Sequence, residues 1–279
     1  MHDKNPLENF SYFYGFLFHS LVIICDCWLL SSRYALFDMI GKLLFSHKNV
    51  KYVTLLKTRD KQFTKRVFDY VHKHFWLRVF LTLCSFSCDG SVWFTVPFVP
   101  VVCYLYKSSQ EPGTFSGWNS ILFSADFSLF CFILLCYCTL SAAIELSLKV
   151  VVRRKRPSFN NKSSFVIPAE KWSFPSGHTM RAFTICSYLS FRIPLLKSWL
   201  PFLRSELVSI LFVCCLFFWA CLVAISRIGR GRHFALDCYA ASVCGRVTSL
   251  VLLTCTVDRF LSTSFFIFIS KLRIISYFL

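Results

Sequence analysis

Acidic residues are scarce in this chain of 279 residues, which has 14 Asp and Glu against 31 Lys and Arg. The few carboxylates form no cluster along the sequence that could hold magnesium, a cation that needs several oxygen ligands. The 15 cysteines show no paired spacing of the kind that binds zinc, so we expect them to be small apolar packing residues. We therefore predict a site without metal and without a cofactor.

The net charge of +17 is not accompanied by any signature of a nucleic-acid-binding fold, so we expect no nucleic acid partner. The positive residues lie between apolar runs, where they can hold anionic head groups. The N-terminal run 10–30 follows Asp3 and Glu8 and has no small-residue cleavage site, so it does not read as a cleavable signal. No internal repeat and no low-complexity segment is visible.

Apolar residues, in contrast, are abundant. They make up 56% of the chain, 33 residues are Phe, and the mean hydropathy is +0.56, which is typical of a membrane protein. A membrane-spanning helix needs about 20 apolar residues. Runs near this length cover 10–30, 77–106, 121–148, 179–196, 207–225 and 234–257.

These runs predict an all-α, polytopic transmembrane helical bundle of about five or six spans. We divide it into an N-terminal region 1–78 with a basic connecting segment, a membrane core 79–257, and an apolar tail 258–279. Whether 10–30 and 260–279 span remains open. The run 77–106 is interrupted at 88–90 and by two prolines, so we expect a kink there. Asp126 and Glu145 fall inside a predicted span, where polar residues should face the bundle interior.

Three short polar clusters stand at the ends of apolar runs, far apart in the sequence. They are Lys149 with Arg156-Pro157, then Pro175-Ser176-Gly177-His178, then Ser226-Arg227 followed by His233 and Asp237. If each run between the clusters crosses the membrane once, all three lie on the same membrane face. We therefore predict that they form one site.

His233 and Asp237 are four residues apart at the start of a helical run, so they share one helix face. A carboxylate placed there can accept a hydrogen bond from one imidazole nitrogen and leave the other nitrogen free as a nucleophile. The alternative is that Asp237 only caps the helix and His233 is an ordinary buried polar residue.

The other two clusters have the chemistry of a phosphate site. Lys149, Arg156 and Arg227 supply fixed positive charge for the oxygens of a transferring phosphoryl group. Pro175-Ser176-Gly177-His178 reads as a turn into a helix, whose N-terminal amides attract an anion. His178 lies at the mouth of that turn, where it can act as a general acid.

Together, the patterns Lys-x6-Arg-Pro, Pro-Ser-Gly-His and Ser-Arg-x5-His-x3-Asp resemble the type 2 phosphatidic acid phosphatase superfamily, the lipid phosphate phosphatases, over 80–257. The resemblance implies that His233 is the nucleophile that forms a phosphohistidine, with Asp237 as its orienter and His178 as the acid. It implies phosphate binding by Lys149, Arg156, Ser176, Gly177 and Arg227. It also implies a metal-independent reaction and a site on the lumenal or extracellular face.

Within this superfamily, the local sequences look most like the polyisoprenoid diphosphate phosphatase branch, which includes presqualene diphosphate phosphatase. The stretch Lys149-Val-Val-Val-Arg-Arg-Lys-Arg-Pro157 carries additional arginines, and Arg181 lies one helical turn after His178. We expect Arg153, Arg154 and Arg181 to suit a second phosphate. The competing interpretation is that such arginines are flanking charges of membrane spans.

We therefore expect an integral membrane enzyme that hydrolyses a lipid (isoprenoid) diphosphate or a lipid monophosphate. The alternatives are a phosphatidate or sphingolipid monophosphatase, a non-catalytic membrane scaffold of the same fold, and a transporter. The expected location is the endoplasmic reticulum or nuclear envelope, although the basic segment 31–78 would draw the active face towards the cytosol. The expected partners are the membrane and the lipid substrate, with a homo-oligomer left open.

Overall fold

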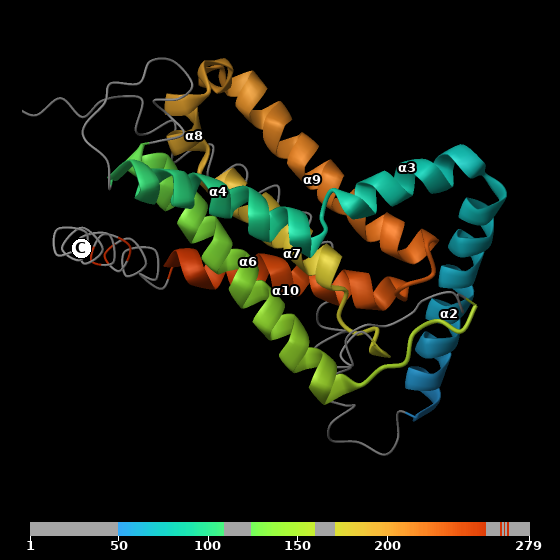
Figure 1. Cartoon of the computed structure of the whole chain (residues 1–279). Coiled ribbons are helices and arrows are strands. Elements are labelled where there is room, and N and C mark those ends of the chain that lie inside the picture. The colour runs from blue at the N-terminus through green and yellow to red at the C-terminus, as the bar shows by residue number, and fades with distance from the viewer. Residues whose placement is uncertain are drawn as a thin grey trace, which may run out of the picture. The chain divides into compact units, whose positions relative to one another are not determined.

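The computed structural model describes residues 50–108, 124–159 and 171–254, together with 263, 265 and 267. The chain divides into two compact units, Met1–Arg59 and Asp60–Leu279. Every site residue named above belongs to the second unit. Its described part is helical and contains no strand, which confirms the predicted all-α class (Figure 1).

Among the described residues, three helices are long and apolar enough to cross a membrane: α6 (Ala125–Val152), α9 (Glu206–Gly229) and α10 (Ala235–Thr254). Helices α3 (Phe75–Phe86) and α4 (Gly90–Ser108) meet at a bend of 43°. If the bent pair is counted as one span, it is the fourth in the described residues. The break falls at the expected kink. The predicted runs 10–30 and 260–279 lie outside the described residues, except for three positions of the latter.

Helix α7 (Gly177–Phe191) is shorter than the predicted run 179–196. The helix ends before Pro194, which has no amide hydrogen to continue the ladder, and a separate helix α8 (Ile193–Trp199) begins there. A 3₁₀ turn η3 (Pro201–Arg204) then leads into α9. The segment between the predicted runs 179–196 and 207–225 is therefore partly helical.

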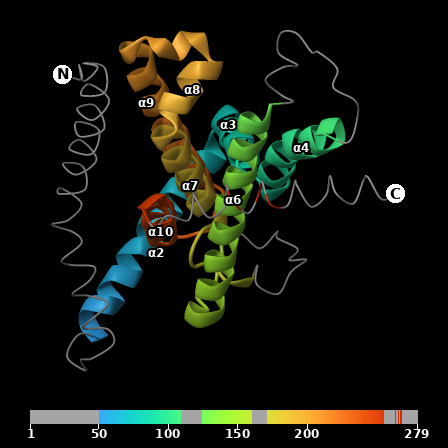
Figure 2. The ribbon, with the colours of Figure 1, turned by 90° about the vertical axis from the view of Figure 1, so that its left-hand side faces the viewer.

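Helix α7 lies between α6, α9 and α10 (Figures 1 and 2). Ten of its fifteen residues are buried. Helix α7 approaches α10 so closely that a Cβ atom on Gly245 of α10 would overlap the carbonyl oxygen of Met180. Helix α7 is thus the central element on which the site is built.

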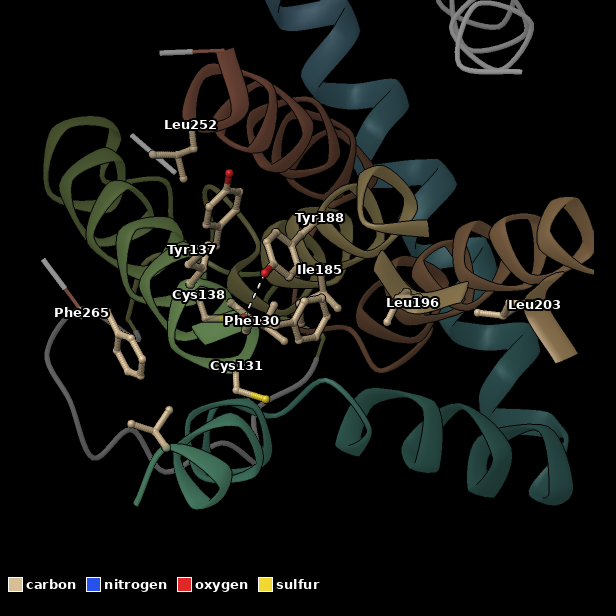
Figure 3. Packing of buried hydrophobic residues seen from close by; sticks show 13 residues of the cluster. Phe130, Cys131, Tyr137, Cys138, Ile185, Tyr188, Leu196, Leu203, Leu252 and Phe265 are labelled. Carbon is tan, nitrogen blue, oxygen red and sulfur yellow. Dashed lines mark hydrogen bonds between the residues drawn. The ribbon is translucent and has the colours of Figure 1, made fainter. Parts of the chain in front are cut away.

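An apolar cluster fixes the end of α7 away from its N-terminus. Tyr188 packs with Phe130 and Tyr137 of α6, and its buried hydroxyl donates to the carbonyl of Phe130 at 2.9 Å (Figure 3). Satisfying this hydroxyl allows a large aromatic ring to be buried at little polar cost. The described cysteines are free thiols, several of them in such apolar clusters.

The two carboxylates inside the predicted spans have different surroundings. Glu145 faces the interior, as expected, and forms an ion pair with Lys149 one turn further along α6. Asp126 does not: it is exposed in the first turn of α6. A negative charge is favourable at that position because the amides of a helix N-terminus are positive.

Candidate active site

The first cluster lies at and after the end of α6. Lys149 is in the last turn and only 6% exposed. Arg153 terminates the helix in a left-handed conformation, with φ of 49°, and its exposed side chain donates back to the carbonyl of Val150 at 2.8 Å. Arg156 donates to the carbonyl of Arg232 at 3.1 Å, which joins the first cluster to the third.

Arg154 lies between two buried carboxylates. It donates to Asp237 at 2.7 Å and to Asp60 at 2.6 Å, and its guanidinium covers the ring of Phe234 at 4.1 Å. Asp60 belongs to helix α2 (Val50–Lys73), far from the recognised motifs. The structure therefore gives Arg154 a bridging role, which we had not expected.

The segment after α6 pairs with the segment before α7. Lys155 and Trp172 form an isolated antiparallel bridge, and the amide of Ser173 donates to the carbonyl of Arg154 at 2.7 Å. This pairing places the carbonyl oxygen of Ser173 2.6 Å from Nδ1 of His233. A carbonyl only accepts, so Nδ1 carries the hydrogen and Nε2 keeps its lone pair.

His233 is 2% exposed. Burial, reinforced by the positive charges of Arg227 and Arg156, lowers the pKa of the His233 imidazole well below its ordinary value. The neutral ring, with Nε2 unprotonated, is the form that can attack phosphorus. Geometry and charge both leave Nε2 of His233 with its lone pair, and the role of His233 as the nucleophile stays a prediction.

Asp237 makes different contacts from those we expected. One oxygen accepts from the amide of Phe234 at 2.9 Å, a capping contact at the start of α10, and the other accepts from Arg154. The next two amides of α10 donate to Thr64 and Asp60 of α2. The helix is therefore fully capped, and the contact that orients His233 comes from Ser173.

The N-terminus of α7 is open by comparison. Ser176 is the capping residue, but its side chain makes no capping bond. Among the described residues, none accepts from the amides of Gly177, His178 and Thr179. A Cβ on Gly177 would overlap the carboxylate of Glu145, so an anionic group already lies against this helix end. Three helix N-terminal amides without an acceptor in the described residues are suited to phosphate oxygens.

Two more arginines surround His178. Arg227 is 8% exposed and donates to the hydroxyl of Ser85 at 2.7 Å, and Arg181, also 8% exposed, donates to the carbonyl of Cys88 at 3.1 Å. The Nε of each guanidinium is buried and has no hydrogen-bond partner in the described part of the chain. Buried donors of this kind favour an anionic ligand.

The structure thus brings together all the predicted catalytic and phosphate-binding residues around the starts of α7 and α10. Asp60 and Ser173 were missed. Asp60 has no motif near it, and Ser173 acts through its main chain, so neither carries a signal in the sequence. In the part of the chain that the structure describes, no group of three or more His, Cys, Asp or Glu could hold a metal ion.

The model of the PAP2 superfamily matches residues 130–261, a range that includes all three clusters. This match supports a relation to the PAP2 superfamily over that range. The chain is 33% identical over 115 residues to a probable lipid phosphate phosphatase beta of Arabidopsis thaliana, a match over 37% of this chain and 54% of that protein. It thus spans about half the length of this curated relative.

The fold is also that of a solved structure, a transmembrane PAP2-type phosphatidylglycerolphosphate phosphatase from Bacillus subtilis. The two align with a TM-score of 0.56 over 80% of this chain and 92% of that one, at 18% identity. The likeness supports the fold of the helical core, including the part before residue 130 that the family model does not match.

Proposed function

We propose that this chain is an integral membrane lipid phosphatase that acts through a phosphohistidine on His233. The observation that carries the proposal is the hydrogen bond of Nδ1 to the Ser173 carbonyl, which leaves Nε2 as a nucleophile among fixed positive charges. The match to the PAP2 model and the lipid phosphate phosphatase named above support it.

In the proposed reaction, Nε2 of His233 attacks phosphorus while His178 gives a proton to the leaving oxygen. Lys149, Arg156 and Arg227 hold the equatorial oxygens, whose charge is greatest in the transition state. Water then cleaves the phosphohistidine. Side-chain cations take the place that a metal ion holds in many phosphoryl-transfer enzymes, and so the reaction is expected to need none.

For the substrate, we propose a lipid diphosphate of the isoprenoid class. Arg181 supports this because it is buried, its charge acts on His178 one helical turn away, and its Nε has no hydrogen-bond partner among the described residues. A second phosphate would place its charge there. Arg154 is held by two carboxylates and Arg153 by its own helix, so Arg181 is the best supported of the three.

A lipid monophosphate, such as phosphatidate or a sphingolipid phosphate, is the second candidate, since the open amides of α7 accommodate one phosphate without help from Arg181. A catalytically inactive scaffold is less well supported, because His178, Arg227, His233 and Asp237 are all present. We further propose a lumenal active face in the endoplasmic reticulum or nuclear envelope.

The test is phosphate release by the purified protein from phosphatidate, sphingosine phosphate, farnesyl diphosphate and presqualene diphosphate. We expect faster release from the diphosphates, and an acid-labile phosphoenzyme that is absent from His233→Ala. Activity that survives in His233→Ala would rule out the phosphohistidine. Release from the monophosphates alone would leave a plain lipid monophosphatase.

A further inference from the structure

Hydrogen bonds hold the break between α3 and α4 to its neighbours, including the start of α7 in the candidate active site. Trp93 and Trp219 donate to the carbonyl and hydroxyl of Ser87 at 2.7 and 2.8 Å. The thiol of Cys88, which is fully buried, donates to the carbonyl of His178 at 3.3 Å, and the Cys88 carbonyl accepts from Arg181. The residue that follows is therefore held in a fixed place next to α7.

That residue is Asp89, and its two carboxylate oxygens have separate tasks. Oδ1 accepts from the amide and the hydroxyl of Ser91 at 3.0 and 2.9 Å, which caps the start of α4. Oδ2 is not needed for the cap and lies 3.5 Å from Nε2 of His178, an ion-pair distance. Asp89 lies outside the residues that match the family model.

The charges around His178 make this contact important. The positive charges of four residues act on the imidazole: Arg227 of α9, Arg230 directly after that helix, Arg181 of α7 and Lys149 of α6. Burial and these four cations lower the pKa of His178 well below its ordinary value. Glu145, which packs at Gly177, is paired with Lys149, which leaves Asp89 as the carboxylate in ion-pair contact with the ring among the described residues.

We propose that Asp89 is a positioning residue for the general acid: its Oδ2 holds the protonated His178 imidazole ready for the leaving oxygen. The inference rests on the proposed phosphatase function. As the bond from His233 Nε2 to phosphorus forms and the bond to the leaving oxygen breaks, the His178 nitrogen that does not face Asp89 gives its proton to that oxygen. The neutral ring later accepts a proton from the attacking water.

The first experiment compares an alkyl phosphate with an aryl phosphate in Asp89→Asn. Asparagine keeps the cap of α4 but removes the charge, so helix α4 should form as before. Loss of one opposite charge at this distance lowers the pKa of His178 by about one unit, which leaves about tenfold less imidazolium. We expect about a tenfold loss of kcat/KM on the alkyl phosphate and little loss on the aryl phosphate, whose leaving group needs no proton.

Ser91→Ala is the matched control, because it removes the hydroxyl that donates to Oδ1 and leaves the charge in place. The ratio of the two activities should stay that of the unaltered protein. Asp89→Glu keeps the charge and should recover part of the alkyl activity. Equal losses on the two substrates in Asp89→Asn would overturn the inference and leave Asp89 as a helix cap.

A second experiment needs no turnover and so separates this inference from the proposed function. Diethyl pyrocarbonate modifies neutral imidazole, and mass spectrometry of the modified peptide gives the pH dependence for His178 alone. In Asp89→Asn the midpoint should fall by about one pH unit. An unchanged midpoint overturns the role of Asp89 even if phosphate release is normal, whereas absent phosphate release with a shifted midpoint overturns only the phosphatase.

Discussion

At the scale of single residues, His233 and Asp237 divide their tasks differently from what their spacing predicts. A separation of four positions on one helix face would bring a carboxylate near an imidazole. The oxygens of Asp237 instead accept hydrogen bonds from the amide of Phe234 and from Arg154. The imidazole is held by Ser173 instead. The acid–base state of His233 is consequently set by its burial and by the arginines around it, which leads to a prediction about pH.

The acid limb of activity should lie below the ordinary pKa of histidine, about 6.5. Only the neutral imidazole attacks, and the lowered pKa of His233 keeps the ring neutral as the pH falls through that value. The measurement is kcat/KM from pH 8 to pH 5 with an aryl phosphate, for which protonation of the leaving group matters least. A fall of activity with a midpoint above 6.5 would contradict the assignment.

Arg181 and Arg154 should differ when each is changed to glutamine. Arg181→Gln should lower kcat/KM for a diphosphate about ten- to a hundredfold more than for a monophosphate, the amount expected for one charge-assisted hydrogen bond. Arg154→Gln should reduce both activities alike, because it leaves Asp60 and Asp237 buried without their cation, a loss of about 3 kcal/mol in the free energy of unfolding.

Thermal unfolding of the two variants provides the control. Arg154→Gln should unfold at a clearly lower temperature than the unaltered protein, and Arg181→Gln at nearly the same one. If Arg181→Gln leaves the ratio of the two activities unchanged, the arginine is a flanking charge. The isoprenoid assignment then rests on family likeness alone.

At the scale of helices, the close approach of α7 and α10 fixes the distance between the two histidine-bearing segments. Gly245→Ala should lower the free energy of unfolding by about 1–3 kcal/mol, since the added methyl group overlaps the Met180 carbonyl and the helices must separate. Val247→Ala, at a position on α10 that is 47% exposed, is the matched control and should have a small effect. A Gly245→Ala variant that unfolds like this control would show that α10 can shift freely.

The sequence predicts helix bounds well where a long apolar run defines the helix. It predicts them less well where a single residue or a distant contact ends the helix. The runs 121–148, 207–225 and 234–257 correspond to α6, α9 and α10. The end of α7 depends on Pro194, and the break at Cys88 and Asp89 depends on contacts with α7 and α9 that are far away in sequence. The tie from Asp60 to Arg154 spans 94 residues, and no local pattern could indicate it.

At the scale of the whole molecule, the described part of the chain gathers positive charge, and no cluster of carboxylates, around the proposed phosphate site. Activity should therefore survive an excess of EDTA, because Lys149, Arg156 and Arg227 supply the charge that a metal ion would. Vanadate should inhibit, as it can adopt the five-coordinate geometry of the transition state on His233. The check is phosphate release in EDTA with and without added magnesium, and activity that magnesium restores would contradict the mechanism.

The bond from His233 to the carbonyl of Ser173 has a consequence for how such proteins diverge. The oxygen that fixes the nucleophile belongs to the peptide backbone, and every amino acid provides the same atom there. Selection can therefore preserve the turn while small side chains replace one another at position 173, so the identity of the residue there understates its importance. Ser173 is itself buried and its hydroxyl donates to the carbonyl of Lys155 at 3.2 Å, so mutagenesis should show tolerance of small residues there and rejection of bulky ones. Proline should also be rejected, because it lacks the amide that donates to Arg154. What must be conserved at this position is the backbone conformation that places the carbonyl oxygen, more than the identity of the amino acid.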